Sequence, residues 1–157
     1  MISSRRAERI DCMAWAPRAW ELQSMDGLGL REAAFAAVEQ GDVMIIDLDD
    51  QPVLMSGITV LWPGVAQLWM FGTEQLEGIH DYPTLRDLMI ESIQQIDDAV
   101  QARGLRRLHV LVNAEIRAHI HFALAVGFVG ERFRLEDVGP NGEDMLLLRW
   151  RKPKWLD

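Results

Sequence analysis

The chain has 157 residues, 49% of them hydrophobic, and a net charge of -8 at pH 7. This composition supports a globular domain with a core and excludes a chain that is disordered throughout. The acidic balance argues against nucleic acid as a partner, because nucleic-acid binding needs a basic face. One cysteine, Cys12, cannot form an internal disulfide. No apolar run reaches the ~18 residues of a membrane span, so we expect a cytoplasmic protein without a membrane partner.

The N-terminal part of the chain predicts two helices. The weak pattern of Met1–Asp11 leaves a first edge strand open. Apolar spacing predicts a short helix over Ala14–Met25, and Pro17 suits a first helical turn because its missing N–H costs nothing there. A second helical stripe covers Leu30–Val38 and ends at Gly41.

The pattern then changes from helical spacing to short apolar runs separated by turns. These runs predict an antiparallel meander of three strands, Val43–Leu48, Val53–Leu61 and Ala66–Phe71. The next link, Gly72–Pro83, is long and polar. Loops of this length often carry function, although a solvated surface loop is the simpler alternative.

A long helix, a strand and a further helix follow. Apolar residues recur at three- and four-residue steps from Leu85 to Val100, which predicts one buried helical face ending at Gly104. The run Leu108–Val112 is typical of a strand covered on both faces. The last predicted strands are Phe128–Leu135 and Asp144–Trp150. The order predicts a single α/β (α+β) domain over residues 1–150, with a mixed central sheet and a basic tail over residues 151–157.

This order of elements resembles the GNAT acyltransferase superfamily over nearly the whole chain. A helix that enters a pair such as Gly127-Phe128, followed by a hairpin, is common near the end of GNAT domains. Two short segments, Phe71–Leu76 and Ala118–Phe122, look like the small GNAT-like proteins of tailed bacteriophages. That group includes internal virion proteins.

The resemblance implies a binding site for acetyl-CoA. In the family, the strands that correspond to residues 66–71 and 107–112 are parallel and splay apart in a V, and the pantetheine arm adds there like a further strand. The pyrophosphate lies at the N-terminus of the long helix, where free N–H groups favour an anion. The implied cofactor-binding residues are Met70, Phe71, Gly72, Thr84, Leu85, Arg86 and Asn113.

The sequence departs from the family pattern at two functional positions. No glycine-rich loop precedes the long helix, and Thr84 and Asp87 resemble a capping pair that occupies the free N–H groups. The position where the family often keeps a tyrosine acid holds Ala123. Acidic residues also surround the expected phosphate position, namely Glu74, Glu77, Asp81 and Asp87. We therefore expect acetyl-CoA to bind weakly or not at all by the conventional route.

Two residues of the polar link are candidates for catalysis. Glu74 follows a strand end and could act as a general base, although a lone carboxylate in a polar loop is more often solvated. His80 is the histidine best placed for chemistry. The simpler role of Asn113 is to cap the next helix through the N–H of Glu115 or Ile116.

The other histidines and the tryptophans have structural explanations. His109, in an apolar strand, is expected to be a core histidine with its hydrogen bonds satisfied. His119 and His121 point in different directions on a helix, so one should pack and one should face solvent, and they cannot hold one metal together. We expect no metal site. Most of the six tryptophans should pack, but an exposed ring at Trp15, Trp20 or Trp62 would indicate a partner surface.

Two functions compete. The first is an acetyl-CoA-dependent N-acetyltransferase that acts on an amine. The second is a GNAT scaffold with little or no catalysis that binds a host protein or a virion component in the host cytoplasm. Fold-level resemblance favours the first, whereas Ala123 and the acidic link favour the second.

Overall fold

The computed structural model describes residues 1–16, 30–139 and 141–156. The elements in this part of the chain are β1 (Ile2–Arg6), α1 (Arg9–Ala14), α2 (Leu30–Glu39), β2 (Val43–Leu48), β3 (Gln51–Trp62), β4 (Val65–Gly72), α3 (Glu74–Glu77), α4 (Tyr82–Ala102), β5 (Arg107–Asn113), α5 (Arg117–Ala125), β6 (Phe128–Leu135), β7 (Met145–Trp150) and the 3-10 helix η2 (Lys154–Leu156). This mixed α/β order confirms the predicted fold class.

The strands form one sheet in the order β1-β2-β3-β4-β5-β7-β6. Neighbours β1–β2, β2–β3, β5–β7 and β7–β6 are antiparallel, whereas β4 and β5 are parallel. The predicted parallel pairing on either side of the long helix is therefore confirmed. Its ladder holds only the pairs Val65–Arg107, Ala66–Leu108 and Gln67–His109, at the start of both strands.

The chain divides into two compact units. The first contains Met1–Thr59 and Trp69–Glu91, and the second contains Val60–Leu68 and Ser92–Asp157. Both β4 and α4 therefore contribute one half to each unit. We describe the units one at a time.

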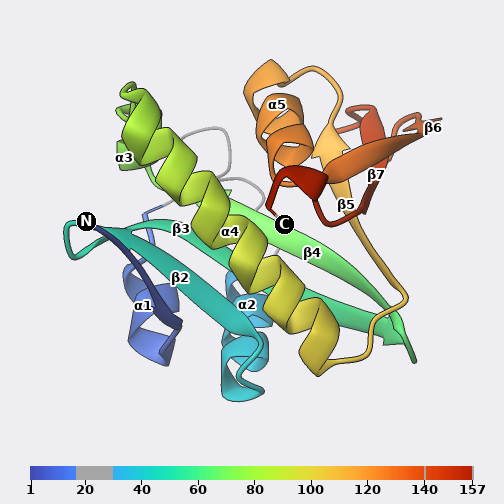
Figure 1. Ribbon diagram of the computed structural model, residues 1–157. Coiled ribbons are helices and arrows are strands. Elements are labelled where there is room, and N and C mark those ends of the chain that lie inside the picture. Colours follow the sequence, from blue (N-terminus) through green and yellow to red (C-terminus); the bar gives the residue numbers. More distant parts are fainter. Residues whose placement is uncertain (17–29, 140, 157) are drawn as a thin grey trace. The chain divides into compact units, whose positions relative to one another are not determined.

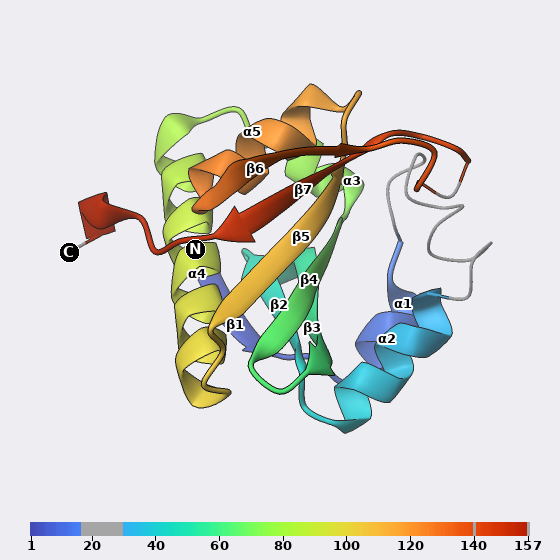
Figure 2. The same ribbon diagram turned by 90° about the vertical axis from the view of Figure 1, so that its right-hand side faces the viewer.

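The first unit has helices on both faces of its strands. Helices α1 and α2 lie on one side of β2 and β3, and the first half of α4 lies on the other (Figures 1 and 2). The core between α1, α2 and the strands contains Cys12, Trp15, Ala34, Val43, Ile45, Met55 and Phe71. Trp69 packs on this core with its indole against Gly57, where a Cβ atom would lie 2.0 Å from the ring.

The second unit is a sheet with α5 against one face. In β5, the buried residues Leu108, Val110 and Val112 alternate with half-buried ones. Leu148 of β7 is paired with Val110, and Phe128 of β6 is paired with Trp150 of β7, so both lie on the same face as these buried residues. The indole N–H of Trp150 donates to the carbonyl of Val126, just after α5, at 3.1 Å.

The ends of three elements differ from the prediction. The helix predicted over Ala14–Met25 is wrong where the structure describes it, because α1 covers Arg9–Ala14 and Trp15 is extended; residues 17–25 lie outside the described residues. The carboxylate of Asp11 accepts the backbone N–H of Glu8 at 2.7 Å, which fixes the earlier helix start. The link Gly72–Pro83 contains the short helix α3, and α4 begins before Thr84.

The basic tail contacts the second unit. The N–H of Arg151 donates to the carbonyl of Gly127 at 2.9 Å, and Lys152 pairs with Asp97 at 2.9 Å. Gly127 has a φ of +102°, and a Cβ atom there would lie 2.6 Å from the carbonyl oxygen of Arg151. The tail thus crosses directly over a position that only glycine fills without strain.

No helix among the described residues is long and apolar enough to cross a membrane.

Gly127→Ala should lower the free energy of unfolding by roughly 2–4 kcal/mol, because it adds a steric clash to an unfavourable φ. Two other glycines serve as controls that separate the steric clash from the unfavourable φ. Gly104 has a φ of +57° with open space around it, so Gly104→Ala should lower the free energy of unfolding by about 1–2 kcal/mol. Gly130→Ala, with neither a positive φ nor a close neighbour, should have little effect. Urea unfolding measures all three; equal losses for Gly127→Ala and Gly104→Ala would contradict the clash.

Candidate functional site

The N-terminus of α4 is capped by a side chain. The N–H of Thr84 donates to Oδ1 of Asp81 at 2.9 Å, and hydrogen bonding by Thr84 holds the pKa of Asp81 below its usual range. The predicted pairing of Thr84 with Asp87 as the cap is therefore wrong, because α4 begins at Tyr82 and Asp81 occupies the position before it.

This cap leaves few donors for an anion. Pro83 has no N–H, the N–H of Thr84 is taken by Asp81, and the N–H of Leu85 donates to the carbonyl of Asp81 at 3.2 Å. Within the described chain, Tyr82 supplies the one first-turn N–H without such a partner. Arg86 is exposed and lies 3.9 Å from Asp87, so its charge is partly offset.

The end of β4 is largely buried. Phe71 belongs to the core of the first unit, Gly72 is buried and Met70 is half-buried. After them, Thr73 donates its N–H to the carbonyl of Val53 at 3.1 Å and its hydroxyl to that of Pro52 at 3.2 Å. A ligand at this strand end would therefore meet backbone rather than the Phe71 side chain.

A pocket of about 380 Å³ opens beside the end of β4 in the first unit. Its lining comes from the end of α1, the start of β3 and the start of α3: Asp11, Ala14, Trp15, Ala16, Gln51, Pro52, Thr73, Glu74 and Gln75. Two acidic residues, Asp11 and Glu74, thus line one pocket together with Trp15. The predicted candidate Glu74 lies here, exposed at the first position of α3.

Arg5 holds one of these carboxylates in place. Its guanidinium donates to both oxygens of Asp11, from Nη1 at 2.7 Å and from Nη2 at 2.8 Å, and its Nε donates to Oδ2 of Asp47 at 2.8 Å. The hydrogen bonds from Arg5 lower the pKa of Asp11. Asp11 is therefore ionised at neutral pH and is poorly suited to accept a proton.

Trp15 lines the pocket, and Cys12 lies in the core of the first unit. Trp15 is 4% exposed, and its indole N–H has no hydrogen-bond partner within the described chain. Burial raises the pKa of the Cys12 thiol, which is fully buried. Cys12 is therefore a core residue rather than a nucleophile.

The second catalytic candidate, His80, does not line the pocket. It is exposed in the link between α3 and α4. Its catalytic role stays a prediction, as does that of Glu74.

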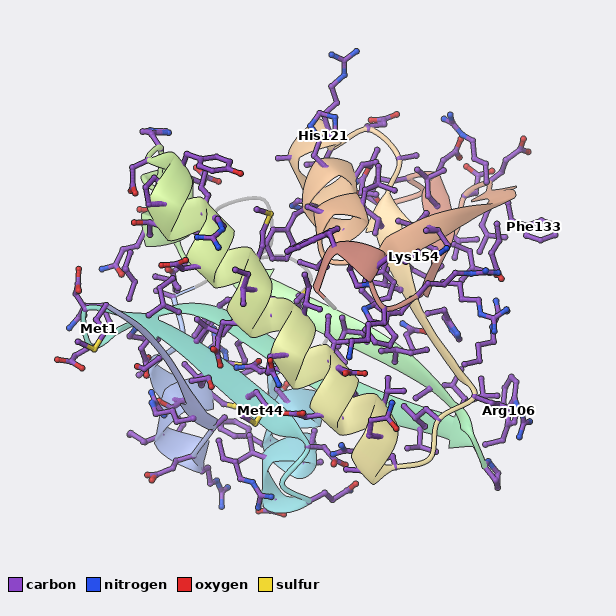
Figure 3. The ribbon with its side chains drawn as sticks, in the orientation of Figure 1. Met1, Met44, Arg106, His121, Phe133 and Lys154 are labelled. Carbon is purple, nitrogen blue, oxygen red and sulfur yellow. The ribbon has the colours of Figure 1, made fainter. Side chains whose placement is uncertain are left out.

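The remaining candidates lie in the second unit. Oδ1 of Asn113 accepts the N–H of Glu115 at 2.9 Å, as predicted, although α5 begins only at Arg117, so the bond closes a turn. His121 is exposed and points outward (Figure 3), whereas His119 is half-buried. Ala123 is buried on α5. Its methyl group cannot supply the proton that a tyrosine would.

His109 differs from the prediction. It is half-buried, and its Nδ1 has no hydrogen-bond partner among the described residues, so the prediction of a satisfied core histidine is wrong. Burial, and then the charge of Arg107, lower its pKa. Apolar neighbours in a strand sequence do not reveal whether a ring nitrogen meets an acceptor across the sheet.

The sequence interpretation missed Asp11, Trp15 and their anchor Arg5. The weak pattern of the first residues gave no firm element to place them on. A usable signal exists in the spacing of Glu8 and Asp11, which is that of a capping box and places a helix start there. No group of three metal-binding side chains occurs among the described residues.

Solved structures with the same fold are acetyltransferases. An acetyltransferase of the GNAT family from Bacillus cereus matches with a TM-score of 0.68 at 10% identity, covering 98% of this chain and 99% of that one. A ribosomal-protein-alanine N-acetyltransferase from Brucella melitensis matches with a TM-score of 0.68 at 17% identity, over 94% and 98% of the two chains. A candidate acetyltransferase from Salmonella typhimurium, solved with its cofactor acetyl-CoA, matches with a TM-score of 0.67 at 12% identity, over 98% and 95%.

These likenesses show that the chain has the fold of GNAT acetyltransferases. No protein-family model and no curated protein sequence matches it.

Arg5→Met should lower the free energy of unfolding by about 1–3 kcal/mol at pH 7, because it leaves the buried carboxylate of Asp47 without its donor. Arg6→Met, an exposed change on the same strand, is the control.

The lowered pKa of Asp11 stabilises the fold above the carboxyl's unfolded pKa, and that contribution is lost as pH falls through the folded pKa. Urea unfolding between pH 2.5 and 7 should therefore show a shallower acid loss for Arg5→Met. An unchanged profile would contradict the clamp.

Proposed function

We propose that this protein transfers an acetyl group from acetyl-CoA to an amine, with a slow chemical step. The observation that carries the proposal is the pocket beside the end of β4, where Asp11 and Glu74 supply two carboxylates for a cationic acceptor. The shared fold supports it, since one neighbour was solved with acetyl-CoA. Fold alone is an analogy, so the pocket supplies the site-level argument.

The two carboxylates have separate roles in this proposal. Asp11, held ionised by Arg5, attracts the ammonium form of the acceptor. Glu74, directly or through a water, takes one proton from that ammonium. The free amine then attacks the thioester carbonyl, the C–N bond forms, and the C–S bond breaks as the CoA thiolate leaves. The amide nitrogen loses its second proton, and the thiolate gains one from solvent.

Two features of the chain make the reaction slow. Ala123 replaces the family's acid, so no side chain at that position protonates the thiolate. Asp81 occupies the N–H of Thr84 and adds negative charge at the N-terminus of α4, where the family resemblance places the pyrophosphate. The predicted backbone and side-chain contacts of acetyl-CoA at Met70, Phe71, Gly72, Thr84, Leu85, Arg86 and Asn113 belong to this proposal.

Glu74→Gln should lower kcat for acetylation of a small diamine by tenfold or more while KM changes less, because the carboxamide cannot take a proton. Glu77→Gln, on the same short helix and outside the pocket lining, is the matched control. Thiol release measured with a chromogenic disulfide reports the rate. Equal activity of Glu74→Gln and wild type, with the control also unchanged, would remove Glu74 from the mechanism.

Asp81→Gly should strengthen acetyl-CoA binding roughly two- to fivefold, because it frees the N–H of Thr84 and removes a charge near the helix end. Asp81→Asn separates the two effects, since it removes the charge and keeps a cap. Asp98→Asn, near the other end of α4, controls for net charge. Calorimetry measures the affinities. Weaker binding by Asp81→Gly would indicate that the cofactor does not approach this helix end.

The capped helix end also favours a second candidate, a scaffold without catalysis that binds another protein. In this reading the chain is related to the GNAT-like proteins of tailed bacteriophages and binds a host protein or a virion component in the host cytoplasm. The engaged donors of Thr84 and Leu85 support it, because they leave little for a phosphate. Absence of acetyl-CoA binding by wild type and by Asp81→Gly alike would favour this scaffold over the enzyme.

A further inference from the structure

The pocket in the first unit is lined by two groups of residues that come from different elements. One group belongs to α1 and the residues directly after it, and we call it the α1 wall: Asp11, Ala14, Trp15 and Ala16. The other group comes from the start of β3 and from the residues that join β4 to α3: Gln51, Pro52, Thr73, Glu74 and Gln75. The proposed base Glu74 is therefore not part of the α1 wall.

The group that contains Glu74 is held by hydrogen bonds of its own. The N–H of Thr73 donates to the carbonyl of Val53 at 3.1 Å, and its hydroxyl donates to the carbonyl of Pro52 at 3.2 Å. Both bonds join β3 to the residue directly before Glu74, and neither involves α1. A change at the α1 wall should therefore leave Glu74 in place.

The end of α1 has no basic residue of its own. The last carbonyl groups of a helix lack partners within the helix, and a cation stabilises them. Here the cation comes from α2, because Nη1 of Arg31 donates to the carbonyl of Cys12 at 2.5 Å and to the carbonyl of Trp15 at 3.0 Å. Trp15 has an extended backbone, so the second bond holds a residue that has already left the helix.

Arg31 is unfavourably placed for α2 itself. It is the second residue of that helix, and the helix dipole opposes a cation near a helix N-terminus. What Arg31 stabilises is the end of α1, which lies beside α2 in the same unit (Figure 2). Together with Arg5, which holds Asp11, it fixes the α1 wall at both of its ends.

We propose that Arg31 is a positioning residue for the acceptor, which holds Trp15 and Ala16 where they contact the apolar body of the amine while Glu74 acts on its nitrogen. This role rests on the proposed function, because an acceptor must enter the pocket. An amine with a large apolar body buries surface against the α1 wall, whereas a very small amine does not. Arg31 therefore sets the KM for larger acceptors, and Glu74 sets kcat.

Binding of 2-phenylethylamine and of methylamine, each measured by NMR titration, tests this role. Arg31→Met should weaken the binding of 2-phenylethylamine at least fivefold and change that of methylamine less than twofold, because only the larger amine reaches the α1 wall. Arg31→Lys should restore most of the affinity, since an ammonium group has enough donors for both carbonyls. If Arg31→Met does not fold, Arg31→Gln, which keeps a shorter donor, takes its place.

The matched control is Arg9→Met. Arg9 also joins α1 to α2, because its guanidinium lies 5.5 Å from the ring centroid of Phe35 and its Nη1 lies 3.9 Å from Oε1 of Glu39, but it does not line the pocket. Its loss should leave the affinity for both amines within twofold of wild type. Equal losses in Arg9→Met and Arg31→Met would show that Arg31 only joins the two helices, which would overturn the positioning role.

Turnover separates the role of Arg31 from the proposed function. Arg31→Met should raise KM for 2-phenylethylamine at least fivefold with kcat within twofold of wild type. If wild type acetylates this amine and Arg31→Met has an unchanged KM, the positioning role alone is overturned. If wild type binds the amine without acetylating it, the proposed catalysis fails, and fivefold weaker binding by Arg31→Met still supports the positioning role. A wild type that binds neither amine overturns both.

Discussion

Three parallel residue pairs determine how the second unit is built. Val65, Ala66 and Gln67 pair with Arg107, Leu108 and His109, and a parallel pair cannot be closed by a short turn. The connection from the end of β4 to the start of β5 must return along the whole strand, which requires a long element. Helix α4 supplies this length with 21 residues. The parallel pair thus explains why a long amphipathic helix stands between two short apolar strands in this sequence.

Acidic and basic residues are distributed unequally between the two units, although the strands of both units belong to one sheet. Most of the acidic excess lies in the first unit, which also contains the pocket, Asp81 and the start of α4. Arg5 is engaged by two carboxylates there, and Arg86 lies beside Asp87. A cation is therefore favoured at the pocket for the same reason that an anion is disfavoured at the helix end. This charge distribution supports the proposal of a positively charged acceptor.

The element order was predictable because each element has a local pattern. The meander from Val43 to Phe71 consists of short apolar runs between turns, and the helix from Leu85 to Val100 follows a period of 3.6 residues; sequence alone reveals both patterns. The parallel pairing came from resemblance to a family rather than from any local signal. Local patterns failed where a capping hydrogen bond decides the start of a helix, at Glu8 and Asp11 and at Asp81 and Thr84. A carboxylate three residues from another residue is a common spacing in a sequence, so the spacing does not identify one helix start.

Of the two acidic residues that line the pocket, the sequence predicted only Glu74, for a related reason. Glu74 was visible as a carboxylate after a strand, whereas Asp11 becomes a site residue only when Arg5, 6 residues away in sequence, turns its guanidinium to both of its oxygens. Such a clamp depends on β1 and α1 meeting in space, and neither element has a strong pattern. The unsatisfied Nδ1 of His109 shows the same limit, since strand periodicity gives a side chain its face and not its hydrogen-bond partner.

Asp81 links stability to function in this molecule. A carboxylate at the position before a helix stabilises that helix by satisfying an N–H group and by opposing the helix dipole. The same N–H and the same dipole are what a phosphate group would use. At this position the chain therefore has either a well-capped helix or a strong phosphate site, and Asp81 selects the cap. Any cofactor that binds here must obtain its affinity from the backbone at the end of β4, where the side chains of Phe71 and Thr73 are already engaged by the protein itself.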